Sequence, residues 1–190
     1  MRRRLARLRR KHPGTPIEVW AEDEARFGLK PVSRRVWAPR GRRPACSGRA
    51  RYEWLYVYGF ARPGTGSLVS LALPRVTAEH MGVALAAFAA RADPDGRKLL
   101  VVLVDNAGWH VAKRLVVPAN VALHRLPPCT PEMQPVERLW PLLREAAANR
   151  EFERLAQLRR VLRRRRTFLA GHPEIVKGAV GFHWAAHLEP

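Results

Sequence analysis

The chain has little cysteine. Among its 190 residues only Cys46 and Cys129 occur, and they do not form a CxxC pair. A zinc ribbon or a disulfide framework needs more cysteines at shorter spacing, so the sequence excludes both and fits a reducing cytoplasm. Membrane-spanning runs of about 20 apolar residues are also lacking. The basic N-terminus has no apolar signal-peptide core. We therefore expect a cytoplasmic protein without a membrane partner.

Acidic residues and lysine are scarce as well. The chain carries 16 Asp and Glu against 35 Lys and Arg, of which only five are lysine, and its formal net charge is +19. This excess predicts a polyanionic partner, most simply nucleic acid. A GC-rich genome is the alternative explanation. It accounts for arginine replacing lysine but not for the shortage of acids.

The length suits one domain with a sizeable core, and the 47% apolar fraction supports a globular fold. Residues 1–16 are expected to form a basic arm or the remnant of a linker. Residues 17–150 are expected to form the main domain, and residues 151–190 a basic helical extension packed on it. No internal repeat or long low-complexity linker divides the chain.

The main elements follow the order strand, strand, strand, helix, strand, helix, strand, helix, helix. The expected strands include 17–21, 52–61, 68–73, 99–104 and 120–126, and 34–44 is expected to add a short strand and a basic turn. Helices are expected over 76–91, 107–116, from the segment carrying Glu137 to about 149, and 150–170. Consecutive strands favour an antiparallel meander, and strands alternating with helices favour parallel addition. The order is that of a ribonuclease H-like α/β fold, a mixed five-stranded sheet flanked by helices.

Three carboxylates stand where these elements would bring them together. Asp105 ends the uniformly apolar run 99–104, which predicts a strand buried on both faces. A carboxylate there is expensive without a neutralising partner. Asp23 follows the first strand, beside which the strand ending at Asp105 can lie, and Glu137 lies in the first turn of the helix after a proline-rich loop. Converging carboxylates suit Mg²⁺, with Mn²⁺ as a substitute.

Two of the three carboxylates, Asp23 and Glu137, also have a simpler interpretation. Glu22, Asp23 and Glu24 are consecutive acids that could pair with Arg34 or Arg35 on the surface. In a strand, Glu22 and Glu24 share one face and Asp23 takes the other. Glu137 could only favour a helix start that Pro135 initiates. Neither interpretation explains Asp105.

Residues that could contact DNA are basic or lie beside Asp105. We list Arg34, Arg35, Arg40, Arg42, Arg43, Trp109 and His110 as candidates. His110 could touch the scissile phosphate, orient a ligand, or only stand at a helix start. Trp37, among the arginines, could stack on a base or belong to the core.

Four sequence blocks resemble the bacterial insertion-sequence branch of the DDE transposases in the mariner superfamily. The blocks are DEARFG at 23–28, WAPRG at 37–41, DNAGWH at 105–110, and LPPCTPEMQPVERLW at 126–140. They occur in the family's order and extend over about 19–144. By motif, the family's three metal ligands correspond to Asp23, Asp105 and Glu137.

This resemblance implies a ribonuclease H-like core that uses Mg²⁺ to cut the ends of a mobile DNA element, with double-stranded DNA as the partner and a place at the bacterial nucleoid. The freed 3′-hydroxyl then attacks target DNA, and a homodimer holds the paired ends. Two ions about 4 Å apart would serve hydrolysis and strand transfer. A stand-alone metal-dependent DNA nuclease and a non-catalytic DNA-binding remnant are the alternatives.

Two features differ from the family pattern. Gln134 stands where members usually have Asn before the proline of the last block. The family also carries an N-terminal helix-turn-helix region that reads the element's terminal repeats, whereas this sequence starts just before the catalytic core. A catalytic fragment, one half of a split reading frame and a remnant all fit this start.

Overall fold

A computed structural model describes residues 1–42 and 51–186. Its strands are β1 (Ile17–Gly28), β2 (Trp54–Ala61), β3 (Leu68–Leu73), β4 (Leu99–Val104) and β5 (Val121–Arg125). Its α-helices are α1 (Arg2–Lys11), α2 (Ala78–Ala92), α3 (Gly108–Val111), α4 (Leu139–Arg144), α5 (Leu155–Ala170), α6 (Pro173–Val180) and α7 (His183–Ala186). Short 3₁₀ helices are η1 (Pro131–Met133), η2 (Pro135–Arg138) and η3 (Glu145–Ala147).

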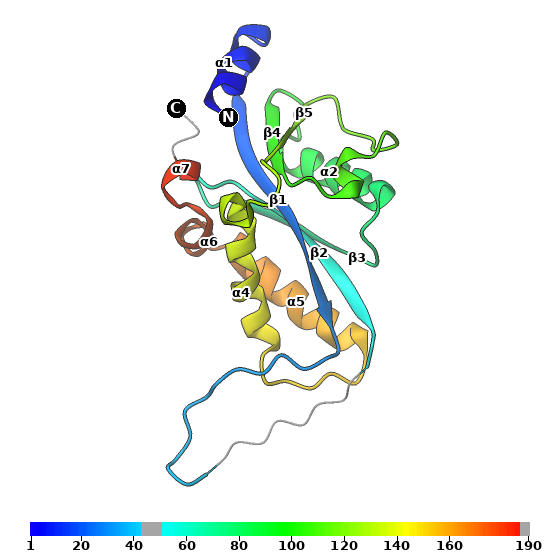
Figure 1. Ribbon diagram of the computed structural model, residues 1–190, viewed down its shortest axis with the longest axis vertical. Coiled ribbons are helices and arrows are strands. Elements are labelled where there is room, and N and C mark those ends of the chain that lie inside the picture. Colours follow the sequence, from blue (N-terminus) through cyan, green and yellow to red (C-terminus); the bar gives the residue numbers. More distant parts are fainter. Residues whose placement is uncertain (43–50, 187–190) are drawn as a thin grey trace.

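The five strands form one mixed sheet in the order β3-β2-β1-β4-β5. β1 to β3 make the predicted antiparallel meander, and β1, β4 and β5 run parallel. The predicted neighbourhood of β1 and β4 is thus confirmed, with Ile17 opposite Leu99 and Ala21 opposite Leu103. Because the two strands are parallel, the C-terminal end of β4 lies beside the middle of the longer β1 (Figure 1).

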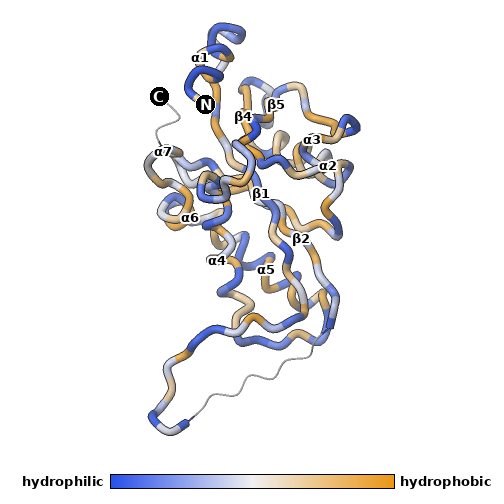
Figure 2. Tube along the Cα trace, in the orientation of Figure 1, coloured by the Kyte–Doolittle hydropathy of each residue, from blue (hydrophilic) through white to orange (hydrophobic). Residues whose placement is uncertain are grey.

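Helices cover both faces of the sheet, and two buried clusters fill the spaces between the layers. α2 packs on one face, where Phe88 stacks on Phe60 at 4.3 Å between ring centroids. α4, α5 and α6 pack on the other face (Figure 1). Every residue of β4 is buried, which fits its uniformly apolar sequence. Hydrophobic residues follow the sheet, whereas α1 is mainly hydrophilic (Figure 2).

The strand predicted within 34–44 is wrong for the described residues. Apart from an isolated bridge of Val32 to Ala148, residues 29–42 have no strand pairing, and they project beyond the end of β1 (Figure 1). The Asn149 side chain takes up both backbone groups of Arg34, accepting from its N–H at 2.8 Å and donating to its carbonyl at 3.0 Å. Trp37 is fully exposed, so the core interpretation of this residue is also wrong.

Helix lengths differ from the predictions mainly at their starts and ends. α3 covers only Gly108–Val111 of the predicted 107–116, and α5 starts at Leu155 rather than Arg150. The helix predicted from Glu137 to about 149 is present as η2, α4 and η3 in succession. The N-terminal residues form α1, anchored by buried Leu5. No helix among the described residues has the length and apolarity to cross a membrane.

Close packing of α4 on the sheet depends on Gly59 of β2, which lies opposite Asp23. A Cβ at Gly59 would lie 2.9 Å from the Trp140 ring, with Val136 and Leu139 also within 3.4 Å. We expect Gly59→Ala to lower the free energy of unfolding by about 1–3 kcal/mol, the usual cost of overpacking. Urea denaturation measures this change.

Gly178→Ala is the matched control, because a Cβ at this helical position meets open space. That substitution should leave stability unchanged or raise it by up to about 1 kcal/mol, since alanine favours a helix. Equal effects of the two substitutions would show that α4 does not rest on Gly59.

Candidate metal and DNA-cleavage site

Asp23, Asp105 and Glu137 line one cavity of about 360 Å³. Asp23 comes from the middle of β1, Asp105 from the end of β4 and Glu137 from η2. The proline-rich loop 127–131 forms much of the opposite wall. None of the described residues that line this cavity carries a positive charge. Three acidic groups therefore converge on a cavity whose described lining has no lysine or arginine.

Asp23 is held by the helix layer. Its Oδ2 accepts a hydrogen bond of 2.7 Å from Nε1–H of Trp140. Burial raises the pKa of Asp23 to about 6, and the charges of Glu24 and Glu137 act in the same direction, whereas the Trp140 hydrogen bond opposes them. Burial, then the charge of Asp105, likewise raises the pKa of Glu137. Burial is thus the main cause of both shifts, and the neighbouring carboxylates add to it.

Gln134 fixes the segment that carries Glu137. Its buried side chain donates a 2.9 Å hydrogen bond to the Glu22 carbonyl of β1. It also caps η2 by accepting from Val136 N–H. The position where this sequence differs from the family pattern thus ties η2 to β1.

Asp105 is half-exposed and is oriented by its own loop. Its Oδ1 accepts from Ala107 N–H at 2.8 Å and faces Nδ1 of His110 at 2.7 Å. The side chain of His110 is 1% exposed, which suits orienting a ligand better than touching a phosphate. Trp109 is half-buried and lines a second hollow together with Asp23 and Asp105.

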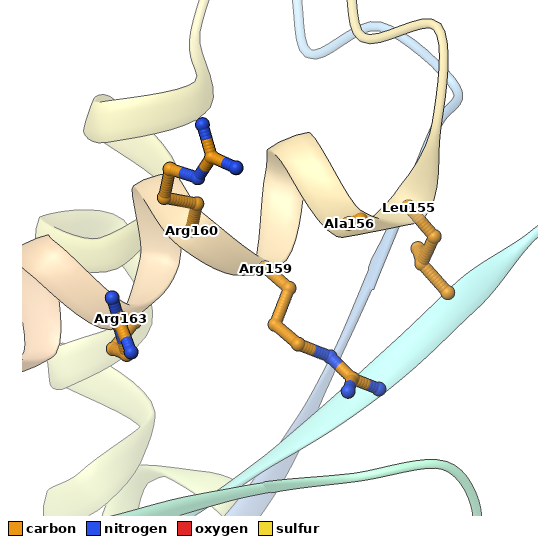
Figure 3. Close-up of a pocket in the computed structure, with 5 residues that line it drawn as sticks. All are labelled: Leu155, Ala156, Arg159, Arg160 and Arg163. Carbon is orange, nitrogen blue, oxygen red and sulfur yellow. The ribbon is translucent and has the colours of Figure 1, made fainter.

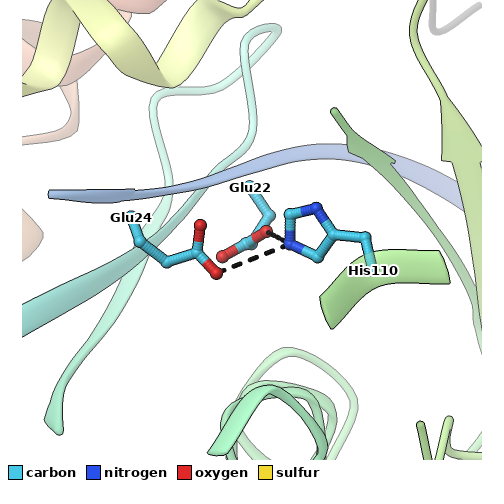
Figure 4. A group of neighbouring side chains, drawn as sticks. All are labelled: Glu22, Glu24 and His110. Carbon is cyan, nitrogen blue, oxygen red and sulfur yellow. Dashed lines mark ion pairs between the residues drawn. The ribbon is translucent and has the colours of Figure 1, made fainter. Parts of the chain in front are cut away.

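On the opposite side of its ring, His110 meets two buried glutamates. Nε2 lies 3.2 Å from Glu22 Oε2 and 3.5 Å from Glu24 Oε1 (Figure 4). The predicted alternation along β1 is confirmed: these glutamates face α3, whereas Asp23 faces Trp140. The suggested pairing of the acids with Arg34 is wrong, because Arg34 lies near Glu145 instead.

The candidate DNA contacts on the segment after β1 are exposed but lie outside the carboxylate cavity. Arg34, Arg35, Arg40 and Arg42 all have this exposed position, and Arg43 is outside the described residues. Sequence reasoning missed two contacts at the site. These are the hydrogen bond from Trp140 to Asp23 and the pairing of His110 with both glutamates. The side-chain alternation along β1 and the tryptophan in the last sequence block were the available signals.

Asp23 makes the stability of the metal-free protein depend on pH. Its pKa is about 6 in the folded protein against an ordinary 3.8, so folding strengthens proton binding. The contribution of Asp23 to the free energy of unfolding is present below about pH 4 and is lost as pH rises through 6. The loss amounts to about 1–3 kcal/mol. Urea denaturation in EDTA should show this loss.

Asp23→Asn should reduce that loss between pH 4 and 7, while Asp95→Asn, in an exposed turn, should preserve it. Saturating Mn²⁺ should also reduce the loss, because a cation favours the ionised carboxylate. An unchanged pH profile in Asp23→Asn would contradict the assigned pKa shift.

Comparison with known proteins gives a consistent result. A family model described as DDE superfamily endonuclease matches residues 18–159. The uncharacterized protein y4pE/y4sA of Sinorhizobium fredii is 40% identical over 92 residues, covering 48% of this chain and 67% of that protein.

Two similar solved structures are the Mos1 transposase paired-end complex with the left transposon end and the Mos1 mariner paired-end complex with Mn. Their TM-scores are 0.55 and 0.56 at 15% and 14% identity, over 96% of this chain. The chain spans about 60% of the Mos1 chain. At this identity the likeness concerns the fold, which is the predicted ribonuclease H-like one.

Proposed function

The chain belongs to the DDE superfamily endonucleases, and on this basis we propose that it is a transposase catalytic domain. It would cleave DNA strands at mobile-element ends and transfer the 3′-hydroxyl into target DNA. The observation that carries this proposal is the convergence of Asp23, Asp105 and Glu137 on one cavity whose described lining contains no lysine or arginine.

The residues of the cavity fit divalent metal. Carboxylate oxygens are the ligands that Mg²⁺ and Mn²⁺ prefer, and three of these groups line one cavity. We propose that Asp23, Asp105 and Glu137 would hold two such ions. When bound, the ions would activate a nucleophile and neutralise the phosphodiester charge.

The protein's own contribution is to hold these ligands before DNA arrives. Trp140 fixes Asp23, and Gln134 fixes the short helix that carries Glu137. β4 presents Asp105 at a rigid buried strand end. Because ligands held on rigid elements need little rearrangement, this arrangement favours catalysis.

We propose double-stranded DNA as the partner, bound by a homodimer at paired element ends. The net charge of +19 supports a polyanion, and the exposed arginines after β1 supply part of it. A further basic surface is the outer side of α5. There Arg159, Arg160 and Arg163 project around a hollow of about 460 Å³ (Figure 3). None of these three forms an ion pair within the described part of the chain, so each is available for a phosphate.

The α5 surface predicts a specific salt dependence. Each phosphate contact contributes about 0.9 to the slope of log affinity against log salt. We expect Arg159→Gln with Arg163→Gln to reduce the slope by about 1–2, whatever the DNA sequence. Fluorescence anisotropy with a labelled duplex in EDTA measures binding without cleavage. Arg97→Gln, exposed in the turn before β4, controls for lost charge. An unaltered slope in the double variant would place DNA elsewhere.

Plasmid cleavage tests the proposed function. Wild-type protein is incubated at low salt with supercoiled plasmid and Mn²⁺, Mg²⁺ or EDTA, since non-specific DNA affinity falls steeply with salt. Nicking in metal but not EDTA, followed by joining of an added DNA end to the plasmid, would support a transposase core. Cutting without joining would favour the stand-alone nuclease. DNA binding without cutting in any metal would contradict the proposal and favour the binding-only remnant.

A further inference from the structure

His110 lies between two buried glutamates, Glu22 and Glu24, and the carboxylate of Asp105. His110 lies on α3, Glu22 and Glu24 on β1, and Asp105 at the end of β4 (Figure 4 shows the first three). The side chains of His110, Glu22 and Glu24 are only 1%, 0% and 5% exposed. Burying such groups is costly unless they compensate one another, so their proximity calls for an explanation.

Both ring nitrogens of His110 face carboxylate oxygens. Nδ1 lies 2.7 Å from Asp105 Oδ1, and Nε2 lies 3.2 Å from Glu22 Oε2. The ring therefore lies between Asp105 on one side and the two glutamates on the other.

The contacts of Asp105 are directed to one oxygen. Within the described residues its Oδ1 takes both the Ala107 N–H and the His110 contact. The carboxylate is thereby held by one edge, and Oδ2 is left to face a ligand. Among the described residues, no side chain other than His110 lies within hydrogen-bonding distance of Asp105.

We propose that His110 is a positioning residue for the cavity carboxylates. Its ring, fixed from behind by Glu22 and Glu24, sets which oxygen of Asp105 meets the metal. The arrangement extends to Glu137, because the Glu22 carbonyl also accepts the Gln134 hydrogen bond that anchors η2. One residue of β1 therefore connects the supports of two metal ligands. This inference rests on the proposed function, in which Asp105 is a ligand.

An alternative is that Glu22, Glu24 and His110 bind an ion themselves, since one ligand atom from each lies within 4.8 Å of the others. That arrangement would require Nε2 to present a lone pair. Supporting partners behind a ligand typically change metal affinity by about 10–100-fold when removed. The two possibilities therefore differ in whether His110 controls affinity or the number of ions bound.

Mn²⁺ titration followed by electron paramagnetic resonance, without DNA, separates them. We expect His110→Gln to weaken Mn²⁺ binding by about 10–100-fold without changing the number of ions. In an Asp105→Asn background, the same substitution should have less than about a twofold further effect, because its route through Asp105 is already lost. His80→Gln, at the start of α2, is the matched control and should leave binding unchanged.

Circular dichroism melting accompanies every variant. If His110→Gln does not fold, Glu22→Gln replaces it as the test variant. This substitution keeps the side-chain size but removes the carboxylate that faces the His110 ring, and it should weaken Mn²⁺ binding by several-fold. Unchanged affinity in a folded variant, full additivity with Asp105→Asn, or loss of one bound ion with the others unaffected would each overturn the proposal. Mn²⁺ binding that does not depend on Asp105 would instead overturn the proposed metal site itself.

Discussion

Replacing Asp105 by asparagine should reduce metal-dependent plasmid nicking by on the order of 10³-fold, since charge stabilisation by metal supplies several kcal/mol of catalysis. The substitution preserves size and removes one negative charge from the end of β4. Nicking of supercoiled plasmid in Mn²⁺ at low salt, compared with wild type over the same time course, measures the loss.

The contacts of Asp105 explain why asparagine should be a poor substitute. Ala107 N–H and His110 both direct hydrogen-bond donors at Oδ1. An asparagine would satisfy them with its carbonyl oxygen, and its NH₂ group would then take the position of Oδ2. A donor group in that position repels a cation instead of binding it. The lost charge and the reversed polarity therefore act together.

Asp95→Asn is the matched control, because the same chemical change falls in an exposed turn and should leave nicking unchanged. Equal nicking by wild type and Asp105→Asn would indicate a contaminating nuclease and contradict the assigned role. Duplex binding in EDTA should survive the substitution, since phosphate contacts by arginine do not require the metal site.

The sheet could be predicted because its signals are local. The run 99–104 is apolar throughout, and every residue of β4 is buried. Turn residues separate β2 from β3, and alternation of strand with helix predicts parallel pairing of the later strands. The error at 34–44 has a tertiary cause. Asn149, far away in sequence, occupies the backbone groups of Arg34 that a neighbouring strand would otherwise have paired with.

Strand order and side-chain alternation could predict which residues meet at the site, but not which groups support them. Strand order places Asp23 near Asp105, and side-chain alternation separates Asp23 from Glu22 and Glu24. Neither indicates which groups stabilise these charges. In the sequence, His110 could equally be a surface contact. Only the structure shows that both of its ring nitrogens face carboxylate oxygens. Hydrogen bonds between elements depend on packing geometry, which sequence periodicity does not specify.

Trp140→Phe should weaken Mn²⁺ binding and nicking by about 10–100-fold, the usual effect of removing a partner that orients a metal ligand. Phenylalanine keeps an aromatic ring against Phe27, whose centroid lies 6.5 Å from that of Trp140, but lacks the Nε1–H that Asp23 accepts. Because this hydrogen bond lowers the pKa of Asp23, its loss should move the pKa above the present value of about 6. More of the carboxyl group is then protonated near neutral pH and competes with metal.

That cause gives the variant a pH signature. Raising the pH should ionise Asp23 in Trp140→Phe and recover part of the affinity, whereas a defect in packing alone would persist at every pH. Trp20→Phe is the matched control, because Trp20 is also buried and also donates to a carboxylate, Glu18, at 3.0 Å, but on the α2 side of the sheet. It should leave Mn²⁺ affinity intact. A pH-independent loss in Trp140→Phe, or an equal loss in both variants, would show that Trp140 acts through general stability and not through Asp23.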